Sequence, residues 1–156
     1  MAKKKKLRNS VKAVIIQDGK LLVLRKKDGA GAYTVLPGGG QKFRETLHQA
    51  LKREVFEEIS TKVSIGKLIH IREYYSEKHD FAYEDREIHQ VEFFFKCNLV
   101  ESYHPKNGHF PDPHQKEVVW VELDQLDEAN FYPVALRKIL KDLKHDKFPI
   151  YLGECN

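Results

Sequence analysis

The stretch R-E-V-F-E-E, from Arg53 to Glu58, constrains the fold and chemistry of this chain more than any other. It places Glu54, Glu57 and Glu58 three and four residues apart, where side chains meet on the surface of a helix. Like charges at that spacing destabilise a helix by about a few tenths of a kcal/mol per pair. If these residues form a helix, we therefore expect a positively charged partner beside the three carboxylates to offset their repulsion.

The residues around this stretch predict a helix over residues 46–59. Thr46 and Gln49 have the spacing of a capping box, in which two side chains satisfy free amides at the start of a helix. The preceding L-P-G-G-G, residues 36–40, interrupts regular structure. Because glycine accepts backbone angles closed to other residues, we expect a shaped loop there.

The acids of this helix lie at the boundary of its inner face. A rotation of about 100° per residue places Glu54 and Glu58 within about 40° of each other, in the sector of Leu51. One interpretation is a surface helix in which Arg53 pairs with Glu57 and the other acids are hydrated. The other is that divalent cations lie among the carboxylates, because Mg²⁺ takes oxygen ligands from carboxylates, water and phosphates.

The rest of the chain predicts a mixed α+β or an α/β/α layered domain. Residues 11–17 and 21–24 form a predicted hairpin around Asp18-Gly19. Alternating or branched apolar residues predict further strands, and a last periodic segment predicts a C-terminal helix. The strands are expected at residues 33–36, 63–71, 91–99 and the V-V-W-V stretch 118–121, and the helix at residues 133–143.

Two segments have the composition of loops. Residues 74–88 are polar and aromatic, which fits either a long hairpin tip or a substrate loop. Residues 103–114 contain three prolines and a glycine, which predicts irregular structure. Eight histidines occur in the chain without a recognisable metal-ligand spacing, so we interpret those in the two loops as scattered.

Length and composition favour one domain in a reducing compartment. We expect a basic flexible tail over residues 1–9, one domain over 10–150 and a C-terminal tail over 151–156 within the 156 residues. Lys3 to Lys6 contribute to the net charge of +4, and such a run of like charge is typical of a solvated tail. Cys97 and Cys155 form no C-x-x-C pair. No apolar run predicts a membrane span or signal peptide, so a cytoplasmic protein is expected.

The glycine loop and the acidic helix together resemble the Nudix box, G-x5-E-x7-R-E-U-x-E-E-x-G-U with U apolar. Gly39, Glu45 and the stretch from Arg53 to Glu58 match at the required spacing, and the preceding L-P-G-G also resembles the family. Ser60 and Thr61 depart from the pattern, where glycine and an apolar residue are expected. Arg44 stands where many members have glycine.

The resemblance implies the α+β Nudix fold, an α/β/α sandwich with a mixed central sheet. It also implies hydrolysis of a diphosphate linkage with Mg²⁺ or Mn²⁺ as cofactor. Metals neutralise phosphate oxygens and lower the pKa of a bound water. By position, Glu57 and Glu58 correspond to metal ligands, Glu54 to a ligand or the general base, and the Gly38 carbonyl to a further ligand. Which glutamate takes the proton differs within the family.

Further roles follow from the same resemblance. Arg53 corresponds to an arginine that orients the catalytic acids, and Glu45 to an acid that steadies the loop and helix. A ligand from outside the box is expected at Glu117, with Glu92 as the alternative. The expected substrate contacts are Arg25, Gly39, Gly40 and Tyr74; Tyr74, Tyr75, Phe81 and Tyr83 either stack on a base or cover a strand edge.

The substrate class stays open at this level. No proline lies between Pro37 and Pro105, which argues against the ADP-ribose subgroup of the family. A nucleoside triphosphate or modified nucleotide is the expected partner, without a stable nucleic-acid partner and with a homodimer as a family-level expectation. The alternative is a Nudix-fold binding module or sensor that does not hydrolyse; such proteins tend to lose box acids, and all three are present here.

Overall fold

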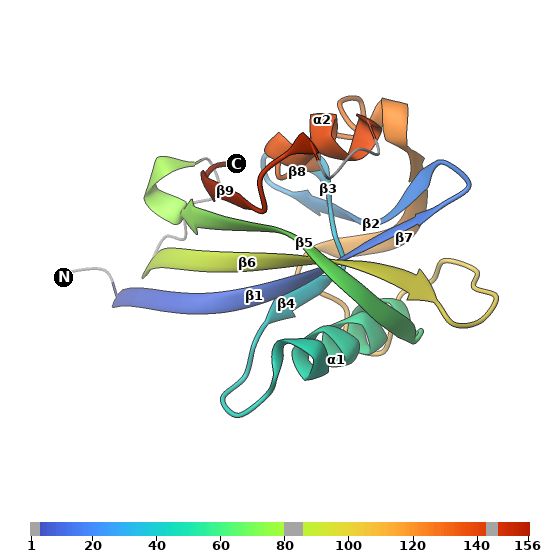
Figure 1. Ribbon diagram of the computed structural model, residues 1–156, viewed down its shortest axis with the longest axis horizontal. Coiled ribbons are helices and arrows are strands. Elements are labelled where there is room, and N and C mark those ends of the chain that lie inside the picture. Colours follow the sequence, from blue (N-terminus) through green and yellow to red (C-terminus); the bar gives the residue numbers. More distant parts are fainter. Residues whose placement is uncertain (1–3, 80–85, 143–146) are drawn as a thin grey trace.

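The computed structural model describes residues 4–79, 86–142 and 147–156 (Figure 1). Within this part of the chain, a nine-stranded mixed sheet has the order β8-β3-β2-β1-β6-β5-β9, with β4 paired to β1 and β7 paired to β2. The strands are β1 Lys4–Gln17, β2 Lys20–Asp28, β3 Gly31–Val35, β4 Gly38–Gly40, β5 Val63–Tyr75, β6 Arg86–Leu99, β7 Gln115–Glu122, β8 Phe131–Tyr132 and β9 Tyr151–Glu154.

Two helices cover opposite sides of this sheet. Helix α1, Leu47–Ile59, lies below the strands and α2, Ala135–Asp142, lies above them in Figure 1. Short 3₁₀ turns, η1 Ser76–Lys78 and η2 Leu123–Gln125, connect other elements. The predicted α/β/α layering with a mixed sheet is confirmed.

The central strand β1 contributes side chains to the apolar clusters on both faces of the sheet. Val11, Ala13 and Ile15 belong to the buried cluster that includes the apolar face of α1. Val14 belongs to the cluster that contains α2. Successive side chains of a strand point to opposite faces, so a strand covered on both faces is apolar at nearly every position.

The predicted hairpin is confirmed. Gln17 pairs with Lys20 across a turn in which Asp18 and Gly19 have φ of 52° and 74°. Positive φ at both central residues is what a two-residue hairpin turn requires. The other predicted strands and both helices are also present, with boundaries shifted by a few residues.

The predicted tails are corrected by the structure. Residues 4–9 belong to β1, where they pair in parallel with the start of β6. Tyr151–Glu154 form β9, which pairs with β5. Backbone pairing with a distant strand gives both segments the hydrogen bonds that their composition alone does not predict.

The segment predicted as a hairpin tip or substrate loop is shorter than expected. Strand β5 continues to Tyr75 and β6 begins at Arg86. Phe81 and Tyr83, two of the expected base-stacking residues, lie outside the described residues.

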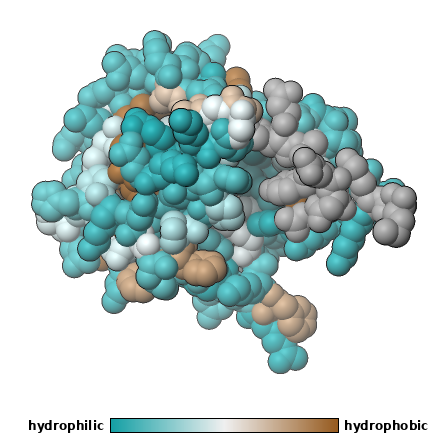
Figure 2. Space-filling model, turned by 180° about the vertical axis from the view of Figure 1, so that it is seen from behind, coloured by the Kyte–Doolittle hydropathy of each residue, from teal (hydrophilic) through white to brown (hydrophobic). Residues whose placement is uncertain are grey.

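The face of the molecule shown in Figure 2 is mostly hydrophilic where it is coloured, with small separate hydrophobic spots. None of the helices in the described part of the chain has the length and apolar character needed to cross a membrane.

Candidate functional site

The start of α1 is fixed by the predicted capping box. The Gln49 amide donates to Thr46 Oγ1 at 3.1 Å, and the Thr46 amide donates to Gln49 Oε1 at 2.9 Å. Both otherwise unsatisfied amides at the helix start thus have partners. The capping box sets where α1 begins and therefore where its acids lie.

Arg53 connects the acids of the helix to the loop before it. Its Nε and Nη2 donate to the two carboxylate oxygens of Glu45 at 2.7 and 2.9 Å, and Nη2 also donates to the Gly40 carbonyl at 3.0 Å. Its Nη1 donates to Glu54 at 2.8 Å and to Glu57 at 3.3 Å. The hydrogen bonds from Arg53 are the main cause that lowers the pKa of Glu45 to about 2. One guanidinium thus orients three carboxylates.

Glu58 is the most buried acid of the box. It is 1% exposed, and its Oε1 accepts the Gly38 amide at 2.8 Å. Its Oε2 is buried and has no hydrogen-bond partner among the described residues. Burial raises the pKa of Glu58 to about 8, although the Lys12 ammonium partly opposes that rise.

Strand β4 requires glycine where it touches β1 and α1. Gly38 has φ of 137°, and a Cβ there would lie 2.0 Å from the Val11 carbonyl oxygen. A Cβ on Gly39 would lie 2.6 Å from the carboxyl carbon of Glu54. The backbone of β4 therefore approaches β1 at Gly38 and the Glu54 side chain of α1 at Gly39 more closely than a larger residue allows.

The carbonyls of β4 also have defined partners. The Lys12 ammonium donates to Gly38 O at 3.2 Å, and the Ser10 hydroxyl donates to Gly39 O at 3.1 Å. Lys12 thus places a positive charge on the carbonyl that the family resemblance assigns to a metal. Its one signal at the level of sequence is that it is a single lysine within the apolar run of β1.

The donor set of this site fits a hard divalent cation. Glu54, Glu57, Glu58 and the Gly38 carbonyl offer only oxygen ligands, which Mg²⁺ and Mn²⁺ prefer. The unpartnered Oε2 of Glu58 is the specific observation in favour, because a buried carboxylate oxygen without a donor is unfavourable. In the described part of the chain, no three acidic, histidine or cysteine side chains already form a metal cluster.

The end of α1 is held by the loop that precedes β7. The amides of Gly108 and Phe110 donate to the carbonyls of Glu58 and Glu57 at 2.8 and 3.0 Å. The Gln115 side chain donates to the Glu58 carbonyl at 2.9 Å. Carbonyls that a helix end leaves unsatisfied are thereby paired.

The two departures from the Nudix box are accommodated at this helix end. Ser60 adopts the left-handed conformation, with φ of 56°, that glycine provides in other members. Thr61 is 3% exposed, so it occupies a buried position like the expected apolar residue. Arg44 also has a positive φ, of 70°.

The predicted contacts outside the box are only partly brought to the site. Arg25 and Glu117 are cross-strand neighbours on β2 and β7 and form an ion pair, with side chains 45% and 51% exposed. Glu92 is instead buried between Arg72, at 3.4 Å, and Gln90. Burial would raise the pKa of Glu92, but the charges of Arg72 and Lys12 lower it below its usual range.

A cavity of about 680 Å³ opens on the face of the sheet away from α1. Of the predicted site, Gly38, Gly39, Tyr74 and Glu92 line it. The residues of the predicted site that do not line it are Arg25, Gly40, Glu45, Arg53, Glu54, Glu57, Glu58 and Glu117. Sequence reasoning missed the cationic and polar residues of its walls, because they come from separate strands and loops. These include Arg8, Ser10, Lys12, Lys26, Asp28, Arg72, Gln90, Asp112, His114 and Asn156.

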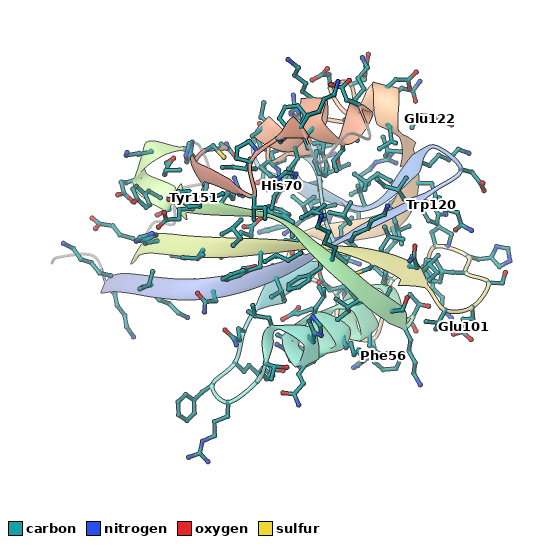
Figure 3. The ribbon with its side chains drawn as sticks, viewed as in Figure 1. Phe56, His70, Glu101, Trp120, Glu122 and Tyr151 are labelled. Atoms are coloured by element: carbon teal, nitrogen blue, oxygen red, sulfur yellow. The ribbon has the colours of Figure 1, made fainter. Side chains whose placement is uncertain are left out.

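The histidines and aromatic residues near β5 have local partners. Tyr74 is 8% exposed and stacks on His79 at 4.9 Å, and His79 contacts Glu154 at 2.8 Å. His70 points from β5 towards the segment before β9, with its ring 2.9 Å from the Pro149 carbonyl (Figure 3). These contacts attach the C-terminal segment to the cavity wall.

Comparison with known proteins identifies the family. The NUDIX domain model matches residues 6–143, so this chain belongs to the Nudix family. No curated protein sequence matches it. Solved structures that it resembles include a NUDIX hydrolase from Nitrosomonas europaea, with 23% identity, a TM-score of 0.70 and 91% of each chain covered.

Two further structures have the same fold. A MutT NUDIX hydrolase from Burkholderia pseudomallei has 21% identity and a TM-score of 0.62, with 88% of this chain and 97% of that chain covered. An ADP-ribose pyrophosphatase from Streptococcus suis has 18% identity and a TM-score of 0.59, with 96% and 98% covered. At these identities the likeness concerns the fold.

Proposed function

We propose that this protein is a Nudix hydrolase that cleaves a diphosphate linkage in a nucleoside triphosphate or a related nucleotide derivative. The observation that carries the proposal is Glu58, a buried carboxylate with one oxygen on the Gly38 amide and the other without a donor. Such a group is unfavourable in a purely structural role. Its presence beside Glu54 and Glu57 supports a site kept for binding cations.

The residues divide into holding and positioning roles. Glu57, Glu58 and the Gly38 carbonyl would hold Mg²⁺ or Mn²⁺, and Glu54 would act as a further ligand or as the general base. A bound metal would neutralise the phosphate oxygens and lower the pKa of a water molecule that it binds. Arg53 orients Glu54 and Glu57 through its hydrogen bonds, and Glu45 fixes Arg53 in turn.

The cavity supplies the binding space for the nucleotide. It begins at Gly38 and Gly39 and extends across cationic residues of β1 and β5, which suit phosphate oxygens. Tyr74 and Glu92 lie in the same cavity and would contact the nucleoside. Glu117 as a metal ligand and Arg25 as a phosphate contact stay predictions. In the structure these two side chains form an ion pair with each other, which would have to separate before either could bind metal or phosphate.

The proposal is tested by a hydrolysis screen of nucleoside triphosphates and nucleoside diphosphate derivatives with Mg²⁺. We expect Glu57→Gln to lower turnover at least about a hundredfold, since a lost ligand removes charge stabilisation at the reacting phosphate. Glu101→Gln, an exposed acid after β6, serves as the matched control and should retain activity (Figure 3).

The same screen separates the hydrolase from a binding module. A parent protein that binds nucleotides with Mg²⁺ but turns none of them over would support the module. A fully active Glu57→Gln variant would defeat the assignment of the site. Cytoplasmic location and a homodimer stay predictions.

A further inference from the structure

Strand β1 carries a row of basic side chains on one face. Alternate residues of a strand share a face, so Lys4, Lys6, Arg8 and Lys12 point the same way, with Ser10 between the last two. Lys4 and Lys6 are exposed, whereas Arg8 and Lys12 are half-buried and line the cavity. We call Lys4, Lys6, Arg8 and Lys12 the β1 basic row. It runs from the surface into the cavity.

Among residues 4–79, 86–142 and 147–156, the cross-strand neighbours of the outer part of this row are not acidic. In the parallel pairing with β6, Lys6 lies beside Ile88 and Arg8 beside Gln90. Lys4, Lys6 and Arg8 form no ion pair with any residue in the ranges that the structure describes. Positive charge on this face is therefore available to a ligand.

The other face of the same run is different. Lys5 points away from the row and has Glu87 as its cross-strand neighbour on β6. Opposite charges side by side on a sheet compensate each other. The charge of Lys5 is thus compensated by Glu87, whereas Lys4 and Lys6 lie on the other face of the strand and have no such neighbour in the described part of the chain. The sequence of three lysines does not distinguish these two faces.

The outer half of β1 also has room beside it. Strand β4 pairs only with residues 10–12 of β1, and β2 only with Ile16 and Gln17. In Figure 1 the N-terminal half of β1 extends beyond both α1 and α2. A ligand that leaves the cavity along β1 meets the exposed Lys6 and Lys4 beyond the ends of α1 and α2, with η1 held against the neighbouring strand through Ser76 and Ile88.

We propose that the β1 basic row binds the phosphate backbone of a single-stranded oligonucleotide whose 5′ phosphates occupy the cavity. Same-face residues of a strand are about 6.6–6.8 Å apart, a spacing that an unstacked nucleotide chain can match phosphate by phosphate. Basic grooves that follow the backbone are how proteins bind single strands without reading sequence. A line of charge, unlike a broad patch, fits a chain better than a flat membrane surface.

This inference rests on the proposed function and names its substrate class. The reaction is the same hydrolysis: the oxygen of water bonds to the α-phosphorus of the 5′ triphosphate, the P–O bond between that phosphorus and the bridging oxygen breaks, and diphosphate leaves. The 5′-monophosphorylated strand remains, and the proton of water is released to a base. The expectation of no nucleic-acid partner rested on a solvated basic tail, whereas residues 4–9 belong to β1.

The test compares a 5′-triphosphorylated ten-nucleotide uridine strand with UTP. Binding of labelled strand to the parent protein is followed by fluorescence anisotropy at several salt concentrations, without added metal. We expect Lys6→Ser to weaken strand binding about threefold to tenfold and to reduce the salt slope by about 0.7, leaving UTP binding unchanged. Lys5→Ser, on the compensated face, is the matched control and should bind the strand like the parent.

Three results would overturn the inference. Equal losses in Lys5→Ser and Lys6→Ser would mean that only overall charge matters. If the parent protein bound the strand no more tightly than UTP, the β1 basic row would not bind an oligonucleotide backbone. Binding of inorganic polyphosphate or anionic lipid vesicles as tight as that of the strand would also contradict the proposal. Strand binding is measured without turnover, so the two proposals can fail separately. A parent protein that binds the strand but hydrolyses no nucleotide would disprove the proposed hydrolase function and still support strand binding by the β1 basic row.

Discussion

At the scale of single residues, Arg53 shows how a helix tolerates three neighbouring glutamates. Its guanidinium donates to Glu45, Glu54 and Glu57, so three carboxylates share one fixed cation. A planar guanidinium does this through directed hydrogen bonds, which a lysine ammonium does not reproduce. Glu58 lies outside this network and is held by a backbone amide instead. The pairing of Arg53 with Glu57 was one interpretation of the sequence, and it coexists with the geometry of a cation site.

Ser60 carries the first prediction. Because Ser60 has φ of 56°, Ser60→Gly should relieve backbone strain and raise the free energy of unfolding by about 0.5–1 kcal/mol, with activity retained. Urea denaturation measures the stability. Ser64→Gly, at an exposed position in β5, is the control and should lower stability by a similar amount. A large loss of turnover in Ser60→Gly would instead show that the hydroxyl contributes to the site.

At the scale of elements, the site depends on how closely β4 approaches α1. Pairing of β4 with residues 10–12 of β1 fixes the glycine strand, and the capping box fixes the start of the helix. The loop of residues 107–115 then fixes the end of the helix through its carbonyls. Three separate segments thus set the position of the acids, although the acids themselves come from one helix.

The close approach at Gly39 gives a second prediction. In Gly39→Ala, the new Cβ would lie 2.6 Å from the Glu54 carboxyl carbon, so Glu54 must move. We expect turnover to fall at least about tenfold while the circular dichroism spectrum is unchanged, since small displacements of catalytic groups are costly. Gly29→Ala is the control, because a Cβ there meets nothing within 4 Å. Equal activity of the two variants would remove Glu54 from the reaction.

At the scale of the whole molecule, the burial of Glu58 offsets part of the stability that the apolar clusters provide. Apolar clusters on both faces of the sheet provide the burial that stabilises the fold. Glu58 is enclosed with them, and burial raises the pKa of its carboxyl to about 8. A buried acid of this kind favours function at the expense of stability.

The pH dependence of stability follows from that pKa. An unfolded glutamate ionises near 4.5, whereas Glu58 in the folded state ionises near 8, so the unfolded state binds fewer protons between these values. Metal-free parent protein should therefore lose stability relative to Glu58→Gln by about 1.4 kcal/mol per pH unit from 4.5 to 8, and no further above 8. Urea titrations of both proteins in EDTA measure this difference. A constant difference across that range would mean that Glu58 is not buried as an acid.

The sequence predicted the elements whose causes are local. The hairpin at Asp18-Gly19, the capping box of Thr46 and the spacing of the acids each depend on residues only a few positions apart. Contacts between distant residues were not predictable in this way. Arg25 and Glu117, expected separately at substrate and metal, pair with each other across β2 and β7.

By itself, the sequence determined the family, the acidic helix and the glycine strand before it, because turn and helix propensities act within a few residues. Only the tertiary structure decided that Lys12 contacts Gly38, that Glu92 is paired with Arg72, and that residues 4–6 are strand and not tail. The physical reason is that charge pairing and sheet pairing depend on which distant segments become neighbours. Those neighbours exist only after the chain has folded.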